Sequence, residues 1–165
     1  MIFLLKKIIR KIYTLKISQT VLKHGKNLKV NGKSSCTKTT ILGDNVNFNG
    51  MIIQGKGKVI IGNNFHSGID CMMISQNHNY DSGEKIPYDN TYILKDIIIE
   101  DNVWVGNRVI ILGGVTIGEG AIIQAGSVVV NDIAPCGIAG GHPAKVFKYR
   151  DIDHYEKLKK DGRFH

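Results

Sequence analysis

The residues with the clearest chemical potential are a histidine between two asparagines, in the run Asn77-His78-Asn79. An imidazole has an intrinsic pKa close to neutral, so it can take a proton from a reacting hydroxyl and return it later in the reaction. A histidine in a polar loop can equally be a solvated surface residue. His66 lies among regularly spaced apolar residues and fits a turn or a subunit contact better than catalysis. The histidines near the termini fit catalysis less well: His24, His154 and His165.

The cysteines and histidines do not predict a metal centre. Cys36, Cys71 and Cys136 are odd in number, far apart and outside any C-x-x-C motif. This pattern disfavours a disulfide framework or a Cys-ligated zinc site and favours a reduced, cytoplasmic setting. A zinc carbonic anhydrase needs three imidazoles around one metal, commonly including a closely spaced pair. His66 and His78 are twelve residues apart, and no such pair is present, so we expect no metal.

Length and composition limit the possible fold classes. A chain of 165 residues with 42% hydrophobic and 22% charged residues normally forms one globular domain around one core. The 19 glycines against 3 prolines indicate many tight turns in a regular structure rather than a flexible linker. No apolar run approaches the roughly 18 residues of a membrane span. Residues 1–25 also lack the uninterrupted apolar region and the cleavage site of a signal peptide.

The net charge of +8 is concentrated at one end of the chain. Residues 1–43 contain ten Lys or Arg and no Asp or Glu, whereas the remainder has a net charge of −2. Such an end could meet a nucleic acid, an anionic membrane or an acidic substrate. We expect no nucleic acid partner, because no aromatic residues alternate with the basic ones at a spacing suited to base stacking.

Residues 1–25 are expected to form a basic amphipathic helical segment. Leu5, Ile8, Ile12 and Leu15 recur at helical spacing, and lysines occupy the other faces. One interpretation is a helix packed on the body of the protein or between subunits, with a solvated basic face. The other is peripheral contact with anionic lipid at the inner face of the cell membrane. The sequence leaves both interpretations open.

The fold is indicated by apolar residues that recur at every sixth position. One unbroken register runs through Ile99, Val105, Ile111, Ile117, Ile123 and Val129. A second, two residues earlier, runs through Ile97, Val103, Val109, Val115, Ala121, Ser127 and Ile133. A weaker version upstream contains Val59, Phe65 and Cys71. Two positions that point the same way in every six residues describe a short strand and a turn, and three such units make a coil of roughly 18 residues. The spacing therefore predicts a stacked parallel β-helix.

The six-residue period defines a β-helix domain over residues 26–147, interrupted by a polar loop at about residues 77–95. The interrupting residues have no register, so they must project from the column, and long loops on rigid scaffolds commonly carry function. Residues 148–165 are expected to form a helical tail, with a short helix over residues 151–160 that helps to cap the last coil. A sandwich or a propeller does not explain the period. The spacing does not determine the hand of the coils.

From about Leu42 to Arg150 the chain resembles the hexapeptide-repeat acyltransferases, in particular bacterial sugar and serine O-acetyltransferases. The most specific segments are Val103-Trp104-Val105-Gly106, Gly113-Gly114-Val115-Thr116-Ile117-Gly118, Ala125-Gly126-Ser127-Val128-Val129 and Gly141-His142-Pro143-Ala144-Lys145-Val146. One departure is His142, where the family usually has Asn or Val. The resemblance implies a left-handed parallel β-helix and a homotrimer that binds acetyl-CoA in grooves between adjacent columns, without a metal.

The resemblance also implies roles for individual residues. His78 would be the general base, since the family's catalytic histidine stands at the start of the loop that breaks the solenoid. Asn47 matches a substrate-contacting asparagine of the galactoside acetyltransferases, with a ladder or turn position as the alternative. Asn77 and Asn79 would flank the base on the acceptor side. The implied contacts of acetyl-CoA are Asn107, Ala125, Val130 and Asn131 for the pantetheine arm, Lys145, Lys148 and Arg150 for the phosphates, and Trp104 for one wall.

The resemblance therefore implies an acetyl-CoA-dependent O-acetyltransferase that acts on a sugar or a glycan precursor of the capsule or lipopolysaccharide type. Transfer would be direct, without an acyl-enzyme, because His78 can take the proton of the attacking hydroxyl while an amide donor stabilises the oxyanion. An N-acetyltransferase of an amino sugar or nucleotide sugar stays open as an alternative. So does a solenoid that serves only as a scaffold. The identity of the acceptor cannot be read from the residues.

Overall fold

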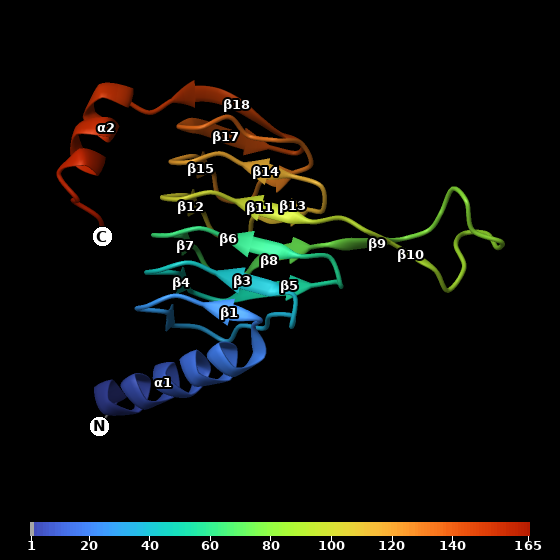
Figure 1. Ribbon diagram of the computed structural model, residues 1–165, viewed down its shortest axis with the longest axis horizontal. Helices are drawn as coiled ribbons and strands as arrows, with labels where there is room; N and C mark the ends of the chain where they lie inside the picture. Colours follow the sequence, from blue (N-terminus) through green and yellow to red (C-terminus); the bar gives the residue numbers. More distant parts are fainter. Residues whose placement is uncertain (1) are drawn as a thin grey trace.

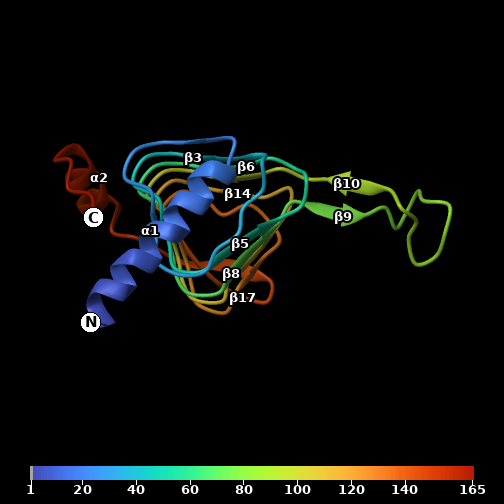
Figure 2. The ribbon, with the colours of Figure 1, turned by 90° about the horizontal axis from the view of Figure 1, so that it is seen from below.

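The chain folds into a three-sided column of stacked coils with an arm that projects from its side (Figure 1). The computed structural model describes residues 2–165, with side chains from residue 4 onward. The coils make about six turns, and successive strands along the chain pass from one to the next of three sheets. Seen from below in Figure 2, the coils overlap as one closed outline from which the arm extends. The parallel β-helix predicted from the six-residue period is confirmed.

Three sheets form the faces of the column. The five-stranded sheet contains β1 (Lys23–His24), β3 (Thr40–Leu42), β6 (Val59–Ile61), β11 (Ile97–Ile99) and β14 (Thr116–Ile117). The seven-stranded sheet contains β2 (Lys29–Val30), β4 (Asn47–Phe48), β7 (His66–Ser67), β12 (Trp104–Val105), β15 (Ile122–Ile123), β17 (Gly137–Gly141) and β18 (Ala144–Tyr149). The four-stranded sheet contains β5 (Met51–Gln54), β8 (Cys71–Ile74), β13 (Ile110–Leu112) and β16 (Val128–Val129).

The apolar registers fill the interior of the column. Every residue of the unbroken register is 1% exposed or less: Ile99, Val105, Ile111, Ile117, Ile123 and Val129. Val59, Phe65 and Cys71 of the weaker upstream register are buried as well. Removing this apolar surface from water stabilises the stack by roughly 25 cal/mol per Å². Both halves of the chain therefore share one continuous core, although the upstream half shows the period less clearly.

Asparagines in the left-handed conformation form one corner of the column, between the five-stranded and seven-stranded sheets. Asn45, Asn64 and Asn102 have φ angles of 56°, 54° and 61°, a region that asparagine tolerates better than most residues. Asn45 Nδ2 donates to Asn64 Oδ1 over 3.1 Å, and Asn64 Nδ2 donates to Asn102 Oδ1 over 2.8 Å. The first hydrogen bond joins residues that are 19 apart in the sequence. The second joins residues that are 38 apart, because the arm is inserted between those two coils. This ladder keeps the coils in register across the insertion.

The arm leaves the column between β8 and β11 on a short antiparallel hairpin, formed by β9 (Gln76–His78) and β10 (Tyr92–Leu94). The loss of the six-residue period predicted a loop here but gave no sign of pairing at its base. Within the connecting residues 79–91, the carboxylate of Asp89 accepts hydrogen bonds from the amides of Thr91 and Glu84 over 2.8 and 2.9 Å. The hydrogen bond from the Thr91 hydroxyl, together with these amides, lowers the pKa of Asp89. The arm is therefore a structured element.

Helix α1 (Ile2–Thr20) lies across the N-terminal end of the column in both Figure 1 and Figure 2. Ile17 and Val21 are buried in the core, and Tyr13 packs half-buried against it. Thr14 Oγ1 accepts a hydrogen bond from the Val30 amide over 3.0 Å. Among the residues described, no helix combines the length and the apolar character needed to cross a membrane. The predicted N-terminal helix is confirmed, and it closes one open end of the coils.

The C-terminal end is closed by β18, which turns back antiparallel to β17. Helix α2 (Ile152–Lys160) follows β18 and lies beside the column rather than over its last coil (Figure 1). The Asp151 side chain caps α2 by accepting a hydrogen bond from the His154 amide over 3.0 Å. Glu119 Oε1 lies 2.7 Å from Lys159 Nζ and accepts a hydrogen bond from Tyr155 Oη over 2.9 Å. Burial raises the pKa of Glu119, but these contacts outweigh burial and leave the pKa below its usual range. The predicted short C-terminal helix is therefore present and anchored through Glu119.

Candidate functional site

His78 lies at the base of the arm, where it ends β9 and pairs with Tyr92 across the hairpin. Its imidazole stacks on the ring of Tyr88, with the centroids 3.7 Å apart and the planes 18° from parallel. The ring of Tyr92 lies 4.8 Å away, tilted by 37°. Aromatic rings at these separations attract each other beyond the area that they bury. The two tyrosines therefore fix the orientation of the imidazole.

One nitrogen of this imidazole has no hydrogen-bond partner. Nδ1 of His78 is buried and makes no hydrogen bond to any of the residues described. Leaving a buried polar atom in this state costs about 1–3 kcal/mol, and native structures contain few of them. A ligand hydroxyl, or a group from another chain, would remove this cost by pairing with the nitrogen. The described part of the chain therefore leaves one ring nitrogen of His78 without a hydrogen-bond partner.

An open pocket of about 410 Å³ lies beside His78. Its walls come from the end of β5, the end of β8 and both strands of the hairpin. Gln76 Oε1 accepts a hydrogen bond from the Lys56 amide over 3.0 Å, which ties the hairpin to the preceding coil. The lining residues are Gln54, Gly55, Ile74, Gln76, Asn77, His78 and Tyr92. The pocket can therefore present amide groups and an imidazole to a small polar molecule.

The asparagines on either side of His78 have different surroundings. Asn77 is exposed, pairs with Ile93 in the hairpin and lines the pocket. Asn79 Oδ1 accepts hydrogen bonds from the Ser82 amide over 3.1 Å and from the Ser82 hydroxyl over 2.9 Å. Asn79 therefore shapes the first turn of the arm, whereas Asn77 borders the space beside the imidazole.

Asn107 and Ala125 lie on another corner of the column, where the chain passes from the seven-stranded to the four-stranded sheet. Small residues are needed here, because a Cβ atom on Gly106 would lie 2.6 Å from the backbone nitrogen of Ala125. His142 Nε2 forms a hydrogen bond with the carbonyl oxygen of Gly126, so the turn between β17 and β18 packs on this corner. A hollow of about 390 Å³ on this corner is lined by Ile69, Asp70, Asn107, Arg108, Ala125 and Gly126.

The other residues expected to bind the donor lie apart from this hollow. Trp104 is 54% exposed on the outer face of the seven-stranded sheet. Val130 and Asn131 follow β16, at the corner from which the arm also leaves the column. Lys145 and Lys148 are exposed on β18. A single chain thus distributes the expected donor contacts over two corners and one face of the column.

Asn47 does not line the pocket beside His78 in the same chain. It is 6% exposed in β4, on the seven-stranded sheet, and its Nδ2 lies 3.3 Å from Nε2 of His66. The ring of His66 in turn lies 5.2 Å from that of His165. Burial lowers the pKa of His66, and the positive charges of His165 and Lys29 lower it further. These influences favour a neutral ring that can accept a hydrogen bond from Asn47.

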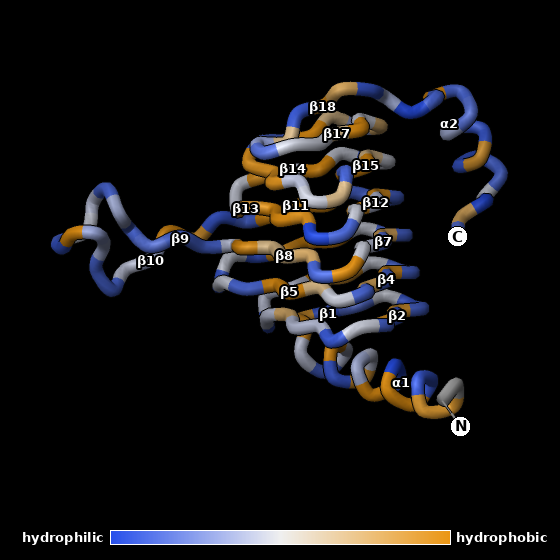
Figure 3. Tube along the Cα trace, turned by 180° about the vertical axis from the view of Figure 1, so that it is seen from behind, coloured by the Kyte–Doolittle hydropathy of each residue, from blue (hydrophilic) through white to orange (hydrophobic). Residues whose placement is uncertain are grey.

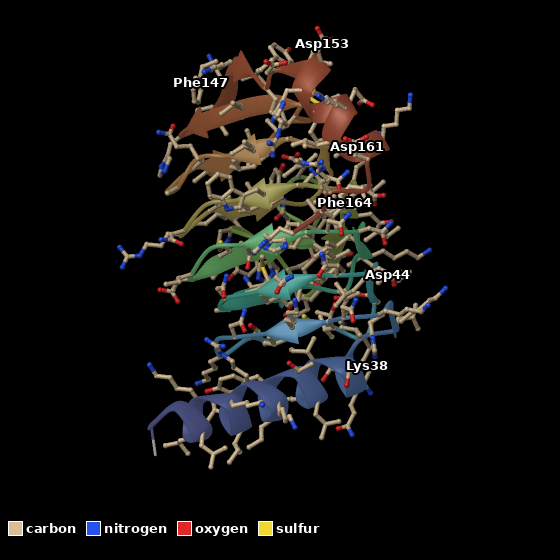
Figure 4. All side chains as sticks on the ribbon, turned by 90° about the vertical axis from the view of Figure 1, so that its left-hand side faces the viewer. Lys38, Asp44, Phe147, Asp153, Asp161 and Phe164 are labelled. Carbon is tan, nitrogen blue, oxygen red and sulfur yellow. The ribbon has the colours of Figure 1, made fainter. Side chains whose placement is uncertain are left out.

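A third hollow, of about 440 Å³, lies between α2 and the seven-stranded sheet. His66 and Trp104 border it on the sheet, and Leu158 and Phe164 border it on the C-terminal segment. Figure 4 shows Phe164 beyond the end of α2, in front of the middle coils. Trp104 therefore faces the C-terminal segment of its own chain rather than the arm.

The pattern of the sequence did not identify the aromatic partners of His78. Tyr88 and Tyr92 follow ten and fourteen residues later and share no periodic position with it. Gln54 and Gly55 come from the coil before the arm, so their approach depends on the stacking of coils. The tyrosines in an otherwise polar loop could have indicated these partners, because two aromatic rings in contact attract each other beyond the area that they bury.

Metal ligands do not cluster in the described part of the chain. Across it, no group of three or more His, Cys, Asp or Glu side chains is arranged to hold a metal ion. Cys36, Cys71 and Cys136 are free thiols. Burial raises the pKa of the Cys36 thiol to about 12 and also raises the pKa of the other two. These thiols stay protonated near neutral pH and are poor nucleophiles, and none of them lines the pocket beside His78.

Known proteins share this fold. Residues 96–131 match a family model described as bacterial transferase hexapeptide (six repeats). A maltose O-acetyltransferase from Clostridium difficile 630 is 30% identical in sequence, with a TM-score of 0.68, over 80% of this chain and 70% of that one. The chain belongs to the hexapeptide-repeat acetyltransferases. Its column is the left-handed parallel β-helix of the hexapeptide-repeat acetyltransferases.

Other acyltransferases of known structure are similar. One from Vibrio cholerae O1 biovar eltor, complexed with acetyl-CoA, is 28% identical with a TM-score of 0.68, over 80% of this chain and 73% of that one. A galactoside acetyltransferase in complex with coenzyme A is 29% identical with a TM-score of 0.73, over 83% of this chain and 70% of that one. An N-acyltransferase from Bacillus cereus is 21% identical with a TM-score of 0.65, over 90% of this chain and 93% of that one. It shares the fold. Comparison with curated proteins gave no match.

Proposed function

We propose that the protein is an acetyl-CoA-dependent O-acetyltransferase whose acceptor is a sugar or a glycan precursor of the capsule or lipopolysaccharide type. The observation that carries the proposal is the imidazole of His78. It is stacked on Tyr88 beside an open pocket, and its buried Nδ1 has no hydrogen-bond partner among the described residues. A sugar-type acceptor is supported by two of the similar structures, which are a maltose O-acetyltransferase and a galactoside acetyltransferase.

His78 acts as the general base of one direct transfer step. Its imidazole takes the proton of the acceptor hydroxyl while that oxygen attacks the thioester carbonyl of acetyl-CoA. Amide hydrogens stabilise the tetrahedral oxyanion, and Gln54 and Asn77 supply such groups at the pocket. The C–S bond then breaks, the CoA thiolate takes the proton from the imidazolium, and the acetylated acceptor departs. No acyl-enzyme forms, because donor and acceptor are held together in one groove.

The donor is proposed to lie along the corner that carries Asn107 and Ala125. A small side chain next to Gly126 lets an extended thiol arm approach the backbone, and side-chain amides pair with its peptide groups. Lysines on β18 supply positive charge for the phosphates. Similar structures hold acetyl-CoA or coenzyme A, which supports a CoA donor. The proposed donor contacts are Trp104, Asn107, Ala125, Val130, Asn131, Lys145 and Lys148.

We propose that the site is completed between copies of a homotrimer. Within one chain, the proposed acceptor residue Asn47 and the donor corner lie on other parts of the column than His78. Contiguous apolar surface marks an interaction site, and the four-stranded sheet, from which the arm departs, has such a surface. Its apolar outward residues are Ile52, Met72, Ile74, Ile110, Leu112 and Val128, and Val130 adjoins them just after β16. A neighbouring copy packed there would bring its own donor corner toward the arm.

The proposed location is the cytoplasm, with contact to the inner face of the cell membrane through residues 1–25. The three free thiols support a reducing compartment. The ten Lys or Arg of residues 1–43, with no acid among them, support attraction to an anionic surface.

Release of free CoA thiol from acetyl-CoA by the full chain tests the proposed function. The acceptor panel contains neutral sugars, amino sugars and nucleotide sugars, and each acetylated product is then treated with mild alkali. An O-acetyl ester is hydrolysed by this treatment, whereas an N-acetyl amide is stable. The proposal predicts thiol release with a hydroxyl acceptor and a product that loses its acetyl group in alkali.

His78→Ala should lose thiol release, and His154→Ala is its matched control, because His154 lies on α2 and away from the arm. The control should release thiol at the wild-type rate. An alkali-stable product from an amino sugar would identify an N-acetyltransferase instead. Protein that releases no thiol with any acceptor class would contradict the transferase proposal and favour a scaffold.

A further inference from the structure

Helix α1 exposes an apolar side. The side toward the column carries Ile17, which is 1% exposed, and Tyr13, which packs against the core. With 3.6 residues per turn, Ile8 lies on the opposite side of the helix from Ile17. Figure 3 shows apolar residues along the side of α1 that points away from the coils. We call these exposed residues the apolar stripe: Leu4, Leu5, Ile8, Ile12 and Leu15.

The apolar stripe is continuous and unpartnered in the described structure. Leu5, Ile8 and Ile12 are 57%, 47% and 58% exposed. From Leu5 onward, successive members of the stripe are three or four residues apart, so their side chains adjoin on one surface of the helix. A helix on a globular protein normally directs such a surface toward the core, whereas here the core is on the other side. The stripe therefore has the character of a docking surface.

A basic groove runs beside α1, between the helix and the first coil. The groove has a volume of about 690 Å³, and residues 24–31 form its second wall. Lys7, Arg10, Lys11, Lys26 and Lys29 line it, and its described lining contains no Asp or Glu. The Asp44 carboxylate lies beside the second wall and accepts a hydrogen bond from the Lys26 amide over 2.6 Å. Five cations in the lining against this one neighbouring carboxylate favour phosphate groups as ligands of the groove.

We propose that the apolar stripe and the basic groove together dock the protein on an anionic phospholipid bilayer. Because α1 lies across the end of the column, it can lie flat in the interface, with the stripe among the acyl chains (Figure 2). The cations of the groove then contact the headgroup phosphates. The column stands on the membrane by its N-terminal end, and the arm projects sideways from it (Figure 1). This surface shares no residue with the pocket at His78, so the inference does not rest on the proposed transferase activity.

Charge favours a bilayer over a second copy of the chain as the partner of this surface. Packing two stripes together would bring two sets of five groove cations close to each other. Residues 1–43 contain no acid to offset that repulsion. An anionic bilayer supplies both an apolar interior for the stripe and charge of the opposite sign for the groove.

Co-sedimentation of the full chain with lipid vesicles tests the inference. Vesicles of phosphatidylcholine alone are compared with vesicles rich in phosphatidylglycerol, at low and at high salt. We expect binding to the anionic vesicles that weakens as salt screens the charges. Equal binding to both kinds of vesicle, or binding to neither, would overturn the inference.

The stripe variant combines Leu5→Gln, Ile8→Gln and Ile12→Gln, and leaves the charge unchanged. Burying three aliphatic side chains is worth enough that the variant should bind anionic vesicles at least about 100-fold more weakly. Ile152→Gln is the matched control, since Ile152 is 53% exposed at the other end of the column, and it should bind like wild type. Far-UV circular dichroism and thermal melting confirm that each variant is folded. A folded stripe variant with wild-type binding would contradict insertion of the stripe.

The groove variant combines Lys7→Gln, Arg10→Gln and Lys11→Gln. Losing three charges next to an anionic surface should weaken binding on the order of 100-fold. The control removes three charges from the C-terminal segment through Lys157→Gln, Lys160→Gln and Arg163→Gln, and should bind like wild type. Wild-type binding by the folded groove variant would exclude the groove from docking. Light scattering measures the oligomeric mass of the wild type and of the stripe variant. If the wild type did not bind vesicles and the stripe variant had a different oligomeric mass, the stripe would be a contact with a second copy of the chain, and the inference would be overturned.

Discussion

The imidazole of His78 and the ring of Tyr88 lie face to face, with their centroids 3.7 Å apart. Tyr88 reaches this position because the arm folds back on itself, so that Tyr92 pairs with His78 across the hairpin. Asp89, next to Tyr88, holds the returning segment through hydrogen bonds from Glu84 and Thr91. The proposed base and its aromatic support therefore belong to one hairpin, whereas the column supplies the far wall of the pocket.

Tyr88→Ala should lower the rate of thiol release while leaving the KM for acetyl-CoA unchanged. The lost stacking is worth about 0.5–1.5 kcal/mol, which corresponds to a fall in kcat of about two- to thirteenfold. Tyr88→Phe keeps the ring and should behave like the wild type. Steady-state kinetics with a thiol reagent measures both variants. If Tyr88→Ala turned over as fast as Tyr88→Phe, the stacked ring would have no positioning role.

Gly106→Ala should disturb the proposed donor corner. The added Cβ would lie 2.6 Å from the backbone nitrogen of Ala125 and 2.9 Å from its Cα, so the backbone must move. Overpacking of this kind costs about 1–3 kcal/mol of stability. We expect a lower unfolding midpoint in urea and a raised KM for acetyl-CoA, with the KM for the acceptor less affected. A folded variant with an unchanged KM for acetyl-CoA would place the donor elsewhere.

The anchoring of α2 should weaken in acid. The pKa of Glu119 is held below its usual range in the folded protein, so the stability that its carboxylate adds is present above the ordinary glutamate pKa of about 4.3. That stability is lost as the pH falls through the lower, folded pKa. Hydrogen exchange of the α2 amides, corrected for intrinsic rates, should show faster opening at low pH than at neutral pH.

Glu119→Gln should open α2 at neutral pH and remove most of this pH dependence. Glu156→Gln is the matched control, because the Glu156 carboxylate lies 3.9 Å from Lys159 and is 58% exposed. Exposed ion pairs contribute little, so this control should change exchange much less. Equal effects of the two substitutions would show that Glu119 does not anchor the helix.

The column could be predicted from the sequence because its core has a short local period. Ile111 and Ile117 are six residues apart, and each is 1% exposed or less. Each coil repeats the same strand and turn, so local spacing specifies the stacking. The upstream half was harder to recognise, since Phe65 and Cys71 occupy register positions that the downstream half fills with aliphatic residues.

The surroundings of the candidate site could not be predicted in the same way. Contacts between His78 and Tyr88 depend on how a non-periodic arm folds back, and no spacing rule encodes that path. Asn47 precedes His78 by about two coils in sequence but lies on a different sheet, so its proposed role needs a second chain. The sequence also could not predict which side of α1 is exposed. Ile17 and Ile8 are equally apolar, and only the packing of the helix on the column buries the first and exposes the second.

Kinetics of His78→Ala test the central claim most directly, with acetyl-CoA and the acceptor that the wild type uses best. Removing a general base lowers the rate of the chemical step by about 10²–10⁴-fold. We predict a fall in kcat of that size, an unchanged KM for acetyl-CoA and a normal unfolding midpoint. A folded His78→Ala variant that releases CoA thiol at the wild-type rate would contradict the account.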